Sequence, residues 1–340
     1  MMRLSPFTYH GPRTLAEAAE LLAAQPRGEA MVVAGGTDLF PNMKRRQQEP
    51  KVVIGLRGVR ELRGIREADA GWLRVGATTT LAEAAAHPLL RTRYSALAEA
   101  AHAVSTPHLR LMGTIGGNLC LDTRCNYYDQ SYHWRRSLHF CMKKDGDVCW
   151  VAPGSPRCWA VSSSDTAPVV VALGAKLRLV SAGGERLVEA RDFFRDDGIL
   201  YLSRRPEEIL AEVLLPPLDP SWRTVYLKLR RRGSFDFPIL GVAAAIKRGD
   251  GIVEDVRLVL GAVGSSPVDV SAAAAPLRGA TPTLDAIEAV AATAYKSARP
   301  LDNTDLNYAW RKKMARVYIR RALAAATGVA LAEREQAESG

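Results

Sequence analysis

The stretch AMVVAGGTDL, residues 30–39, places two adjacent glycines directly after a short apolar run. The run predicts a buried strand, and the glycines predict a tight turn at its end. Residues 13–25 have the Leu and Ala spacing of a helix, and VVIGL at 52–56 predicts a second strand. A helix and strands in this order are typical of a small α/β unit.

The glycine turn itself has the features of an anion site. The backbone N–H groups of Gly35, Gly36 and Thr37 can form a concave nest, to which the Thr37 hydroxyl adds a donor. Glycine is needed where a phosphate must approach the backbone closely. An ordinary turn that ends a strand is the alternative, because short motifs of this kind recur often.

A second glycine loop, GTIGGN at 113–118, follows a strand and helices predicted over 72–104. Its Asn118 amide is a candidate to bond a phosphate or a ring edge. Two such loops in consecutive α/β units indicate a ligand with two phosphates, such as a dinucleotide, lying between the units. The spacing differs from G-x-G-x-x-G opening a helix, so a Rossmann domain is disfavoured.

The pattern changes again in the second half of the chain. Residues 166–190 predict an apolar helix and paired strands around a Gly-Gly turn, and the proline-rich stretch at 207–220 predicts a domain boundary. Strands are then predicted at 224–229, 238–249 and 253–264, and helices at 284–297 and 305–326. These features predict a compact α+β unit followed by a frayed tail of about a dozen residues.

The composition is that of an ordinary globular protein. Hydrophobic residues make up 47% of the 340 residues and charged residues 24%, which argues against bulk disorder. The net charge of +10 comes mostly from scattered arginines without an aromatic-interleaved basic motif, so nucleic-acid binding is only weakly supported. No run reaches the roughly 18 apolar residues of a membrane span, and no signal-peptide stretch is recognised. We expect a cytoplasmic protein without a membrane partner.

All five cysteines lie between residues 120 and 158. In a reducing cytosol, clustered cysteines are more often metal ligands or redox groups than disulfides. Four thiolates from an irregular loop can hold a [4Fe-4S] cluster, whereas zinc more often shows C-x-x-C ligands, which are missing here. Buried inert thiols are a third possibility, although NYYDQSYHWRR and MKKDGD around them are too polar to predict a core. His133 and His139 are further candidate ligands, but histidine on a polar loop is more often solvated.

Four segments together resemble the FAD-binding medium subunit of the xanthine dehydrogenase family of molybdenum enzymes. They are VVAGGTDLFPNMKRR, GATTTLAEAA, GTIGGNL and YLKLRRRGSFDFPILGVAAA, and the likeness runs over about residues 4–325. The resemblance implies an α+β protein with the two-subdomain FAD-binding fold of the molybdenum-hydroxylase medium subunit (PCMH-type) and a C-terminal α+β domain. The implied boundaries are 1–58 and 59–220 for the two FAD-binding subdomains, 221–326 for the C-terminal domain and 327–340 for a flexible tail.

The resemblance also implies which residues contact FAD, because the family holds the FAD pyrophosphate with two glycine loops beneath a C-terminal domain. Carried onto this sequence, the contacts are Val32, Val33, Ala34, Gly35, Gly36, Thr37, Asp38, Leu39, Val104, Gly113, Thr114, Ile115, Gly116, Gly117, Asn118, Asp165 and Lys228. Taken alone, Asp165 in SSSDTAP is equally typical of a helix N-cap, and Lys228 is more typical of a solvated strand lysine.

The cysteine segment is an insertion relative to most medium subunits of that family, which pass from GGN to a D-A-A-P-like sequence through a short loop. Here residues 119–164 intervene. The spacing of Cys125, Cys141, Cys149 and Cys158 is similar to that of the cluster-binding insertion in the beta subunits of 4-hydroxybenzoyl-CoA reductases. The resemblance implies that these four cysteines ligate a [4Fe-4S] cluster in an insertion at about 120–162. Cys120 is instead expected to pack as a small apolar residue under the flavin loop.

The same resemblance implies electron transfer and no substrate pocket in this chain. Electrons would pass from ferredoxin through [4Fe-4S] and FAD towards the [2Fe-2S] clusters and molybdenum cofactor of partner subunits, which reduce 4-hydroxybenzoyl-CoA to benzoyl-CoA. The implied assembly is a heterotrimer that dimerises.

A basic rim of Arg135, Arg136, Lys143 and Lys144 is expected to receive an acidic ferredoxin, with a generic solvated surface as the alternative. Two other functions stay open. One is the medium subunit of a hydroxylase that oxidises an aromatic or heterocyclic substrate and exports electrons. The other is a zinc-stabilised module without redox activity.

Overall fold

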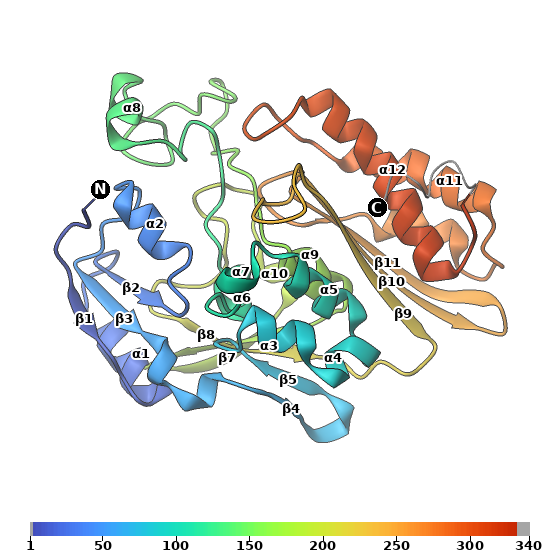
Figure 1. Ribbon diagram of the computed structural model, residues 1–340, viewed down its shortest axis with the longest axis horizontal. Helices are drawn as coiled ribbons and strands as arrows, with labels where there is room; N and C mark the ends of the chain where they lie inside the picture. Colours follow the sequence, from blue (N-terminus) through green and yellow to red (C-terminus); the bar gives the residue numbers. More distant parts are fainter. Residues whose placement is uncertain (1–2, 332–340) are drawn as a thin grey trace.

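The computed structural model describes residues 3–331, which form three sheets flanked by helices (Figure 1). The N-terminal sheet lies at the left of the figure, the largest sheet runs through the middle, and the C-terminal sheet with its helices lies at the right. No helix among residues 3–331 is long and apolar enough to cross a membrane.

The first sheet is parallel, with the strand order β1-β3-β2. Its strands are β1 (Thr8–His10), β2 (Ala30–Val33) and β3 (Val52–Gly55), and its helices are α1 (Leu15–Ala23) and α2 (Leu39–Lys44). Helix α1 begins at Thr14, whose hydroxyl accepts a hydrogen bond from the Glu17 amide. The strands predicted at 30–35 and 52–56 and the helix predicted at 13–25 are therefore confirmed.

The second sheet is antiparallel and has five strands in the order β4-β5-β8-β6-β7. Its strands are β4 (Ile65–Glu67), β5 (Leu73–Gly76), β6 (Lys176–Ser181), β7 (Gly184–Glu189) and β8 (Ile209–Leu215). The pattern at 207–220 predicts only a proline-rich connection, but β8 is the middle strand and every one of its residues is buried. Because β8 is covered on both faces, its sequence ILAEVLL does not alternate between apolar and polar residues, and its one charged residue, Glu212, is buried against arginines, so the pattern misses the strand.

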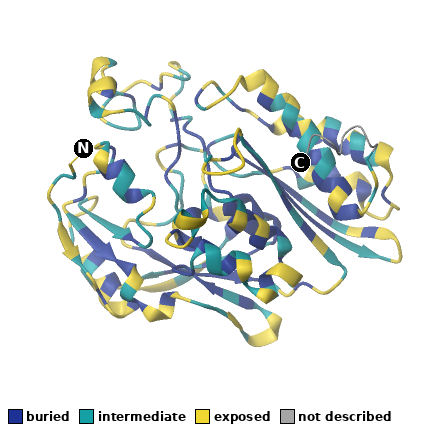
Figure 2. Ribbon diagram, viewed as in Figure 1, coloured by how far each residue is buried: buried dark blue, intermediate teal, exposed yellow. Residues whose placement is uncertain are grey.

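Short helices surround this second sheet. They are α3 (Leu81–Ala86), α4 (Pro88–Arg93), α5 (Ser95–Ala103), α6 (Pro107–Arg110), α7 (Ile115–Leu119), α9 (Thr166–Ala172) and α10 (Ala190–Phe193). The apolar faces of all these helices except α6 form the largest core cluster together with β5, β6 and β8. In Figure 2 the buried residues are accordingly concentrated in the strands and in the helices directly above them.

The third sheet is antiparallel, in the order β12-β11-β10-β9. It consists of β9 (Trp222–Leu229), β10 (Leu240–Gly249), β11 (Ile252–Gly261) and β12 (Val268–Asp269), packed against α11 (Leu284–Ala294) and α12 (Tyr308–Thr327). The predicted strands and helices of this unit are confirmed. Helix α12 ends at Gly328, which has a φ of 76°. Of the expected tail at 327–340, residues 332–340 lie outside the described residues.

The cysteine segment connects α7 to α9 and extends above the first sheet, beside α2 (Figure 1). It is mostly irregular, with one short helix, α8 (Tyr132–Ser137). Its two ends are joined by paired hydrogen bonds between the backbones of Arg124 and Val161, at 2.8 and 2.7 Å. The segment therefore leaves and re-enters the fold at one place, next to the second glycine loop.

Candidate functional site

A cavity of about 800 Å³ lies where the two glycine loops meet. All residues from 32 to 39 line it, as do Val104, Gly113, Thr114, Gly116, Gly117, Asn118 and Asp165. Two of the expected contacts do not line it. The Ile115 side chain is fully buried in the main core, and Lys228 lies behind Asp165. The cavity thus brings together most of the residues that the sequence predicts for one ligand.

Glycine is required at three positions of the cavity wall. A Cβ on Gly35 would overlap the carbonyl oxygen of Met112, so the first glycine loop packs directly against the start of the second. Gly36 has a φ of +71°, which L side chains rarely adopt. A Cβ on Gly116 would lie 2.6 Å from the Cβ of Ala77. These close approaches fix the two loops against each other.

The two loops differ in what they offer to an anion. Within residues 3–331, the N–H groups of Gly35, Gly36 and Thr37 donate no hydrogen bond, so they are available to a phosphate. In the second loop, Gly113 N–H donates to Leu109 at 2.7 Å, and Gly117 N–H donates to the Thr114 hydroxyl at 3.0 Å. The predicted nest therefore fits the first loop, whereas the second uses these amides to hold its own shape.

Asn118 joins the second loop to the start of α9. Its side-chain oxygen accepts hydrogen bonds from the Ser164 hydroxyl at 2.9 Å and from the Thr166 hydroxyl and amide at 2.7 and 3.1 Å. Only its side-chain N–H groups are left for a ligand, because the oxygen is fully engaged.

Asp165 is a buried anion in the cavity wall, only 2% exposed. It accepts hydrogen bonds from the Tyr226 hydroxyl at 2.8 Å and from Lys228 Nζ at 2.9 Å. Asp165 stands at the N-cap position of α9, as the alternative predicts, but its side chain makes no capping hydrogen bond. The solvated-lysine alternative for Lys228 is wrong, because that side chain is 4% exposed. Burial raises the pKa of Asp165 and lowers the pKa of Lys228, and their ion pair opposes both shifts.

Arg124 is a cavity residue that the motifs do not single out, although it stands next to Cys125. Its guanidinium donates to Asp38 at 2.8 Å and to Asp129 at 3.0 Å, and lies 4.3 Å from the ring centre of Phe237. Burial raises the pKa of Asp38, and Arg124 opposes that shift. One side chain thus ties the first glycine loop, the cysteine segment and the loop after β9 together.

Other cavity residues come from segments without a recognisable motif. Tyr201, Arg204 and Glu208 lie between α10 and β8, and nothing in their sequence signals a site. Phe235 and Phe237 also line the cavity, and they do lie inside the segment YLKLRRRGSFDFPILGVAAA that carries the family resemblance.

All four cysteines of the insertion are buried, whereas Cys120 is partly buried, packs against the main core and lines the cavity. Cys125 and Cys158 form a small apolar cluster with Tyr128 and Ala160. The prediction that the surroundings are too polar for a core is therefore wrong. Tyrosine rings and aliphatic stems supply apolar surface that a count of polar residues misses.

The Cys158 thiol and nearby backbone N–H groups lower the pKa of Cys149, although burial opposes this shift. The Cys149 thiol and burial together raise the pKa of Cys158. Burial raises the pKa of Cys125 to about 12, and the neighbouring Cys141 and Cys149 add to the shift. Within residues 3–331, no three Cys, His, Asp or Glu side chains are close enough to share one metal ion. His133 and His139 are exposed.

Two members of the predicted basic rim are not on a rim. Arg135 is 2% exposed and donates to the carbonyl oxygens of Arg45 and Arg46, both at 2.9 Å, at the end of α2. The Lys143 side chain is 6% exposed. Both cations bind groups within the fold, Arg135 at the end of α2 and Lys143 at Asp122 and Gly198, so the expectation that both face a partner is wrong.

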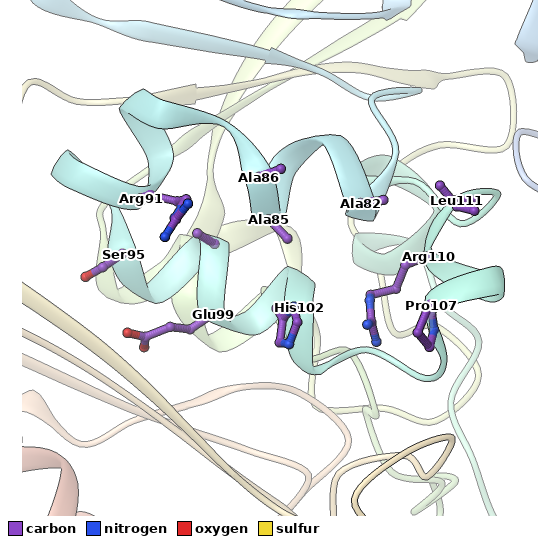
Figure 3. Close-up of a pocket in the computed structure, with 11 residues that line it drawn as sticks. Ala82, Ala85, Ala86, Arg91, Ser95, Glu99, His102, Pro107, Arg110 and Leu111 are labelled. Carbon is purple, nitrogen blue, oxygen red and sulfur yellow. The ribbon is translucent and has the colours of Figure 1, made fainter.

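A second hollow, of about 670 Å³, lies between α3, α5 and α6 (Figure 3). Ala82, Ala85 and Ala86 line one side, and Glu99 and His102 line the other. Glu99 already accepts the Tyr226 amide at 2.8 Å. The hollow contains none of the predicted site residues, so the glycine-loop cavity is the better candidate for a ligand.

The fold and the cavity together define a flavin-binding class, and two family models match the chain. The FAD binding domain in molybdopterin dehydrogenase matches residues 5–218, and the CO dehydrogenase flavoprotein C-terminal domain matches residues 224–326. The chain therefore belongs to the family of FAD-binding medium subunits of the xanthine dehydrogenase and CO dehydrogenase enzymes. The predicted fold class is confirmed, and the chain is a subunit of an oxidoreductase that binds FAD.

Individual relatives agree with this assignment. The chain is 33% identical over 314 residues to the aldehyde oxidoreductase FAD-binding subunit PaoB of Escherichia coli K12, covering 87% of this chain and 92% of the relative. The solved carbon monoxide dehydrogenase of Hydrogenophaga pseudoflava superposes with a TM-score of 0.78 at 28% identity, covering 96% of this chain and 99% of the other. Quinoline 2-oxidoreductase of Pseudomonas putida 86, at 23% identity and a TM-score of 0.76, shares the fold; the match covers 96% of this chain and 99% of the other.

Proposed function

We propose that this chain is the FAD and [4Fe-4S] subunit of a molybdenum enzyme that reduces 4-hydroxybenzoyl-CoA to benzoyl-CoA. Ferredoxin would deliver the electrons, and partner subunits with [2Fe-2S] clusters and the molybdenum cofactor would receive them in a heterotrimer that dimerises. The observation that carries the proposal is that four buried cysteines of one segment neighbour each other: Cys125 lies near Cys141 and Cys149, and Cys158 lies near Cys149. When bound, FAD exchanges one or two electrons and a [4Fe-4S] cluster exchanges one.

The cavity residues fit FAD. The three unused N–H groups of Gly35, Gly36 and Thr37 would hold a phosphate, and Gly35 leaves no room for a side chain between the loops. Asp165 and the side-chain N–H groups of Asn118 would orient the polar edges of the cofactor from the opposite wall. On this assignment residues 1–58 and 59–220 are the two FAD-binding subdomains, and 221–326 cover them.

The cysteine segment supplies suitable ligands for a [4Fe-4S] cluster, namely four thiols. Its four thiols are buried, and two of them, Cys125 and Cys158, share one apolar cluster with Tyr128. The Ala160 amide already donates to the sulfur of Cys158 at 3.4 Å. Each thiolate of a [4Fe-4S] cluster binds its own iron, so the four need not converge on one ion. The similarity to FAD-binding subunits supports the flavin, and the cluster part of the proposal rests on the cysteine segment alone.

The residues that we propose for the contact with ferredoxin differ from the basic rim that the sequence predicts. Arg136 is exposed and Lys144 is at the surface, and both lie on the same segment as the exposed side chains Trp134, Val148 and Trp150. Mixed basic and aromatic surfaces suit a transient complex with an acidic electron carrier. We therefore assign the outer face of the cysteine segment, rather than Arg135 and Lys143, to this contact.

An assay of the intact complex tests the function. The molybdenum-loaded complex, purified with its partner chains, is expected to convert 4-hydroxybenzoyl-CoA to benzoyl-CoA with a low-potential electron donor. Failure of that reaction together with oxidation of an aromatic or heterocyclic substrate would favour a hydroxylase that exports electrons. Stoichiometric zinc in place of iron would favour a zinc-stabilised module.

A further inference from the structure

Lys143 lies between the cysteine segment and the flavin cavity. Its ammonium group donates to Asp122 Oδ1 at 2.8 Å, to the Thr123 hydroxyl at 2.7 Å and to the Gly198 carbonyl at 2.6 Å. An ammonium group has three N–H donors, so all of them are engaged. The side chain is 6% exposed, which fixes a positive charge at one buried point.

Two aromatic rings enclose the same ammonium group. Its nitrogen lies 4.9 Å from the ring centre of Tyr128 and 5.3 Å from that of Tyr201. Tyr128 belongs to the apolar cluster around Cys125 and Cys158, whereas Tyr201 lines the flavin cavity. The lysine therefore contacts the walls of both sites.

The two ends of the Lys143–Asp122 pair face different sites. Asp122 lines the cavity, and its other oxygen accepts the Tyr128 hydroxyl at 2.9 Å and the Gln48 side chain at 3.3 Å. On the lysine side, Gly198 packs so closely on Cys158 that a Cβ there would lie 2.6 Å from the sulfur. The carboxylate thus stands at the cavity and the ammonium group stands next to the thiols.

We propose that the Lys143–Asp122 pair sets the reduction potentials of the groups on its two sides. A positive charge favours the reduced form of a neighbouring redox group, and a negative charge disfavours it, because reduction adds an electron. The ammonium end raises the potential of a group bound to the cysteines, and the carboxylate end lowers that of the flavin. The cysteine half of the inference rests on the proposed function, while the flavin half rests on FAD binding alone.

The experiment measures midpoint potentials by spectroelectrochemical titration of the intact, cofactor-loaded complex. Lys143→Met removes the cation and leaves Asp122 uncompensated, so both potentials are expected to fall. Asp122→Asn keeps the shape and leaves Lys143 uncompensated, so both are expected to rise. Shifts of opposite sign distinguish a charge effect from loss of structure, since a purely structural role would not give them.

Two further variants serve as controls. Lys144→Met removes the neighbouring lysine, which pairs with Asp145 at 3.0 Å on the outside of the segment, and is expected to leave both potentials unchanged. Lys143→Arg keeps the charge and is expected to stay near the wild-type values.

The outcomes separate the two proposals. If both potentials stay at wild-type values in Asp122→Asn, or fall there as in Lys143→Met, the inference is overturned even where stability changes. If the wild-type complex contains FAD but no iron beyond that of the [2Fe-2S] clusters in the partner subunits, the proposed function fails, and the flavin potentials alone decide the inference.

Discussion

Among residues 3–331, two Lys–Asp pairs are buried, and both of their aspartates line the flavin cavity. Lys228 and Asp165 are 2.9 Å apart and 4% and 3% exposed, and Lys143 and Asp122 are 2.8 Å apart and 6% exposed each. The two pairs differ in the secondary structure that carries the lysine. Lys228 stands on β9, where its strand neighbour is Gly241, whereas Lys143 stands on an irregular turn after Cys141.

The two regions are attached to the cavity in different ways. The C-terminal sheet has an extensive apolar core of its own and places one charged pair at the contact. The cysteine segment has only a small apolar cluster and is held by buried cations at several points: Arg124, Arg135 and Lys143. Removing a charge is therefore expected to affect one local contact in the first region and the order of the whole segment in the second.

The largest expected effect comes from breaking the pair on β9. Lys228→Met leaves the Asp165 carboxylate buried without its cation, which typically costs about 3–5 kcal/mol. We expect a fall of that size in the free energy of unfolding, measured by urea denaturation at neutral pH. Lys247→Met on the adjacent strand removes a lysine that is 33% exposed, and it is expected to leave the free energy of unfolding close to the wild-type value. An equal loss of unfolding free energy in Lys228→Met and Lys247→Met would contradict the expectation that the buried pair matters more than the exposed one.

A second variant tests the attachment of the cysteine segment. Arg135→Met leaves the carbonyl groups of Arg45 and Arg46 without their donor, and is expected to cost about 2–3 kcal/mol. The loss should appear as faster amide hydrogen exchange in residues 130–160, while β9 and β10 remain protected. Arg136→Met, the exposed neighbour, serves as the matched control. Uniform loss of protection over the whole chain would show that the segment does not unfold separately.

A third variant changes the cavity without changing charge. Gly35→Ala places a Cβ against the Met112 carbonyl oxygen, which forces the two glycine loops apart. Overpacking of this kind costs about 1–3 kcal/mol, and here it should also abolish retention of FAD. The ratio of flavin to protein after gel filtration measures it. Gly154→Ala, where a new Cβ meets nothing within 4 Å, should retain FAD fully; full retention by both would contradict the role of Gly35.

The smallest expected effect is the pH dependence of the stability that Glu208 contributes at the edge of the cavity. Burial raises the pKa of Glu208, but hydrogen bonds from Arg186 and Arg205 outweigh it and lower the pKa below its usual 4.5. The contribution to stability is therefore present above pH 4.5 and is lost as the pH falls through the folded-state pKa. Because Arg186 is 35% exposed, Glu208→Gln should cost at most about 1 kcal/mol at pH 7. Thermal unfolding of both proteins from pH 7 to 3 should converge at the acid end, and a constant difference would contradict this.

The regular parts of the fold were predictable because their patterns are local. The strands at 30–33 and 52–55 and the unit after residue 221 follow from apolar runs bounded by Gly and Pro. The middle strand β8 was not predictable in the same way, because a fully buried strand lacks alternation and its flanking prolines indicate a connection.

The cavity was partly predictable. Glycines allow backbones to approach each other or a ligand closely, so the glycines of the two loops were enough to predict a ligand site there. Tyr201 and Arg204 reach the cavity only through the packing of an irregular segment, which no local pattern encodes. The burial of Arg135 and Lys143 was missed for a related reason. Whether a cation faces solvent depends on carbonyl groups supplied by distant residues such as Arg45 and Gly198.

The proposed iron–sulfur cluster of the cysteine segment can be tested by measuring iron and acid-labile sulfide in the anaerobically purified complex, with the contribution of the partner subunits subtracted. We predict about four irons per chain in the wild type and in Cys120→Ser, and loss of about four in Cys125→Ser or Cys141→Ser. A wild-type chain without iron, or equal loss from Cys120→Ser, would contradict it.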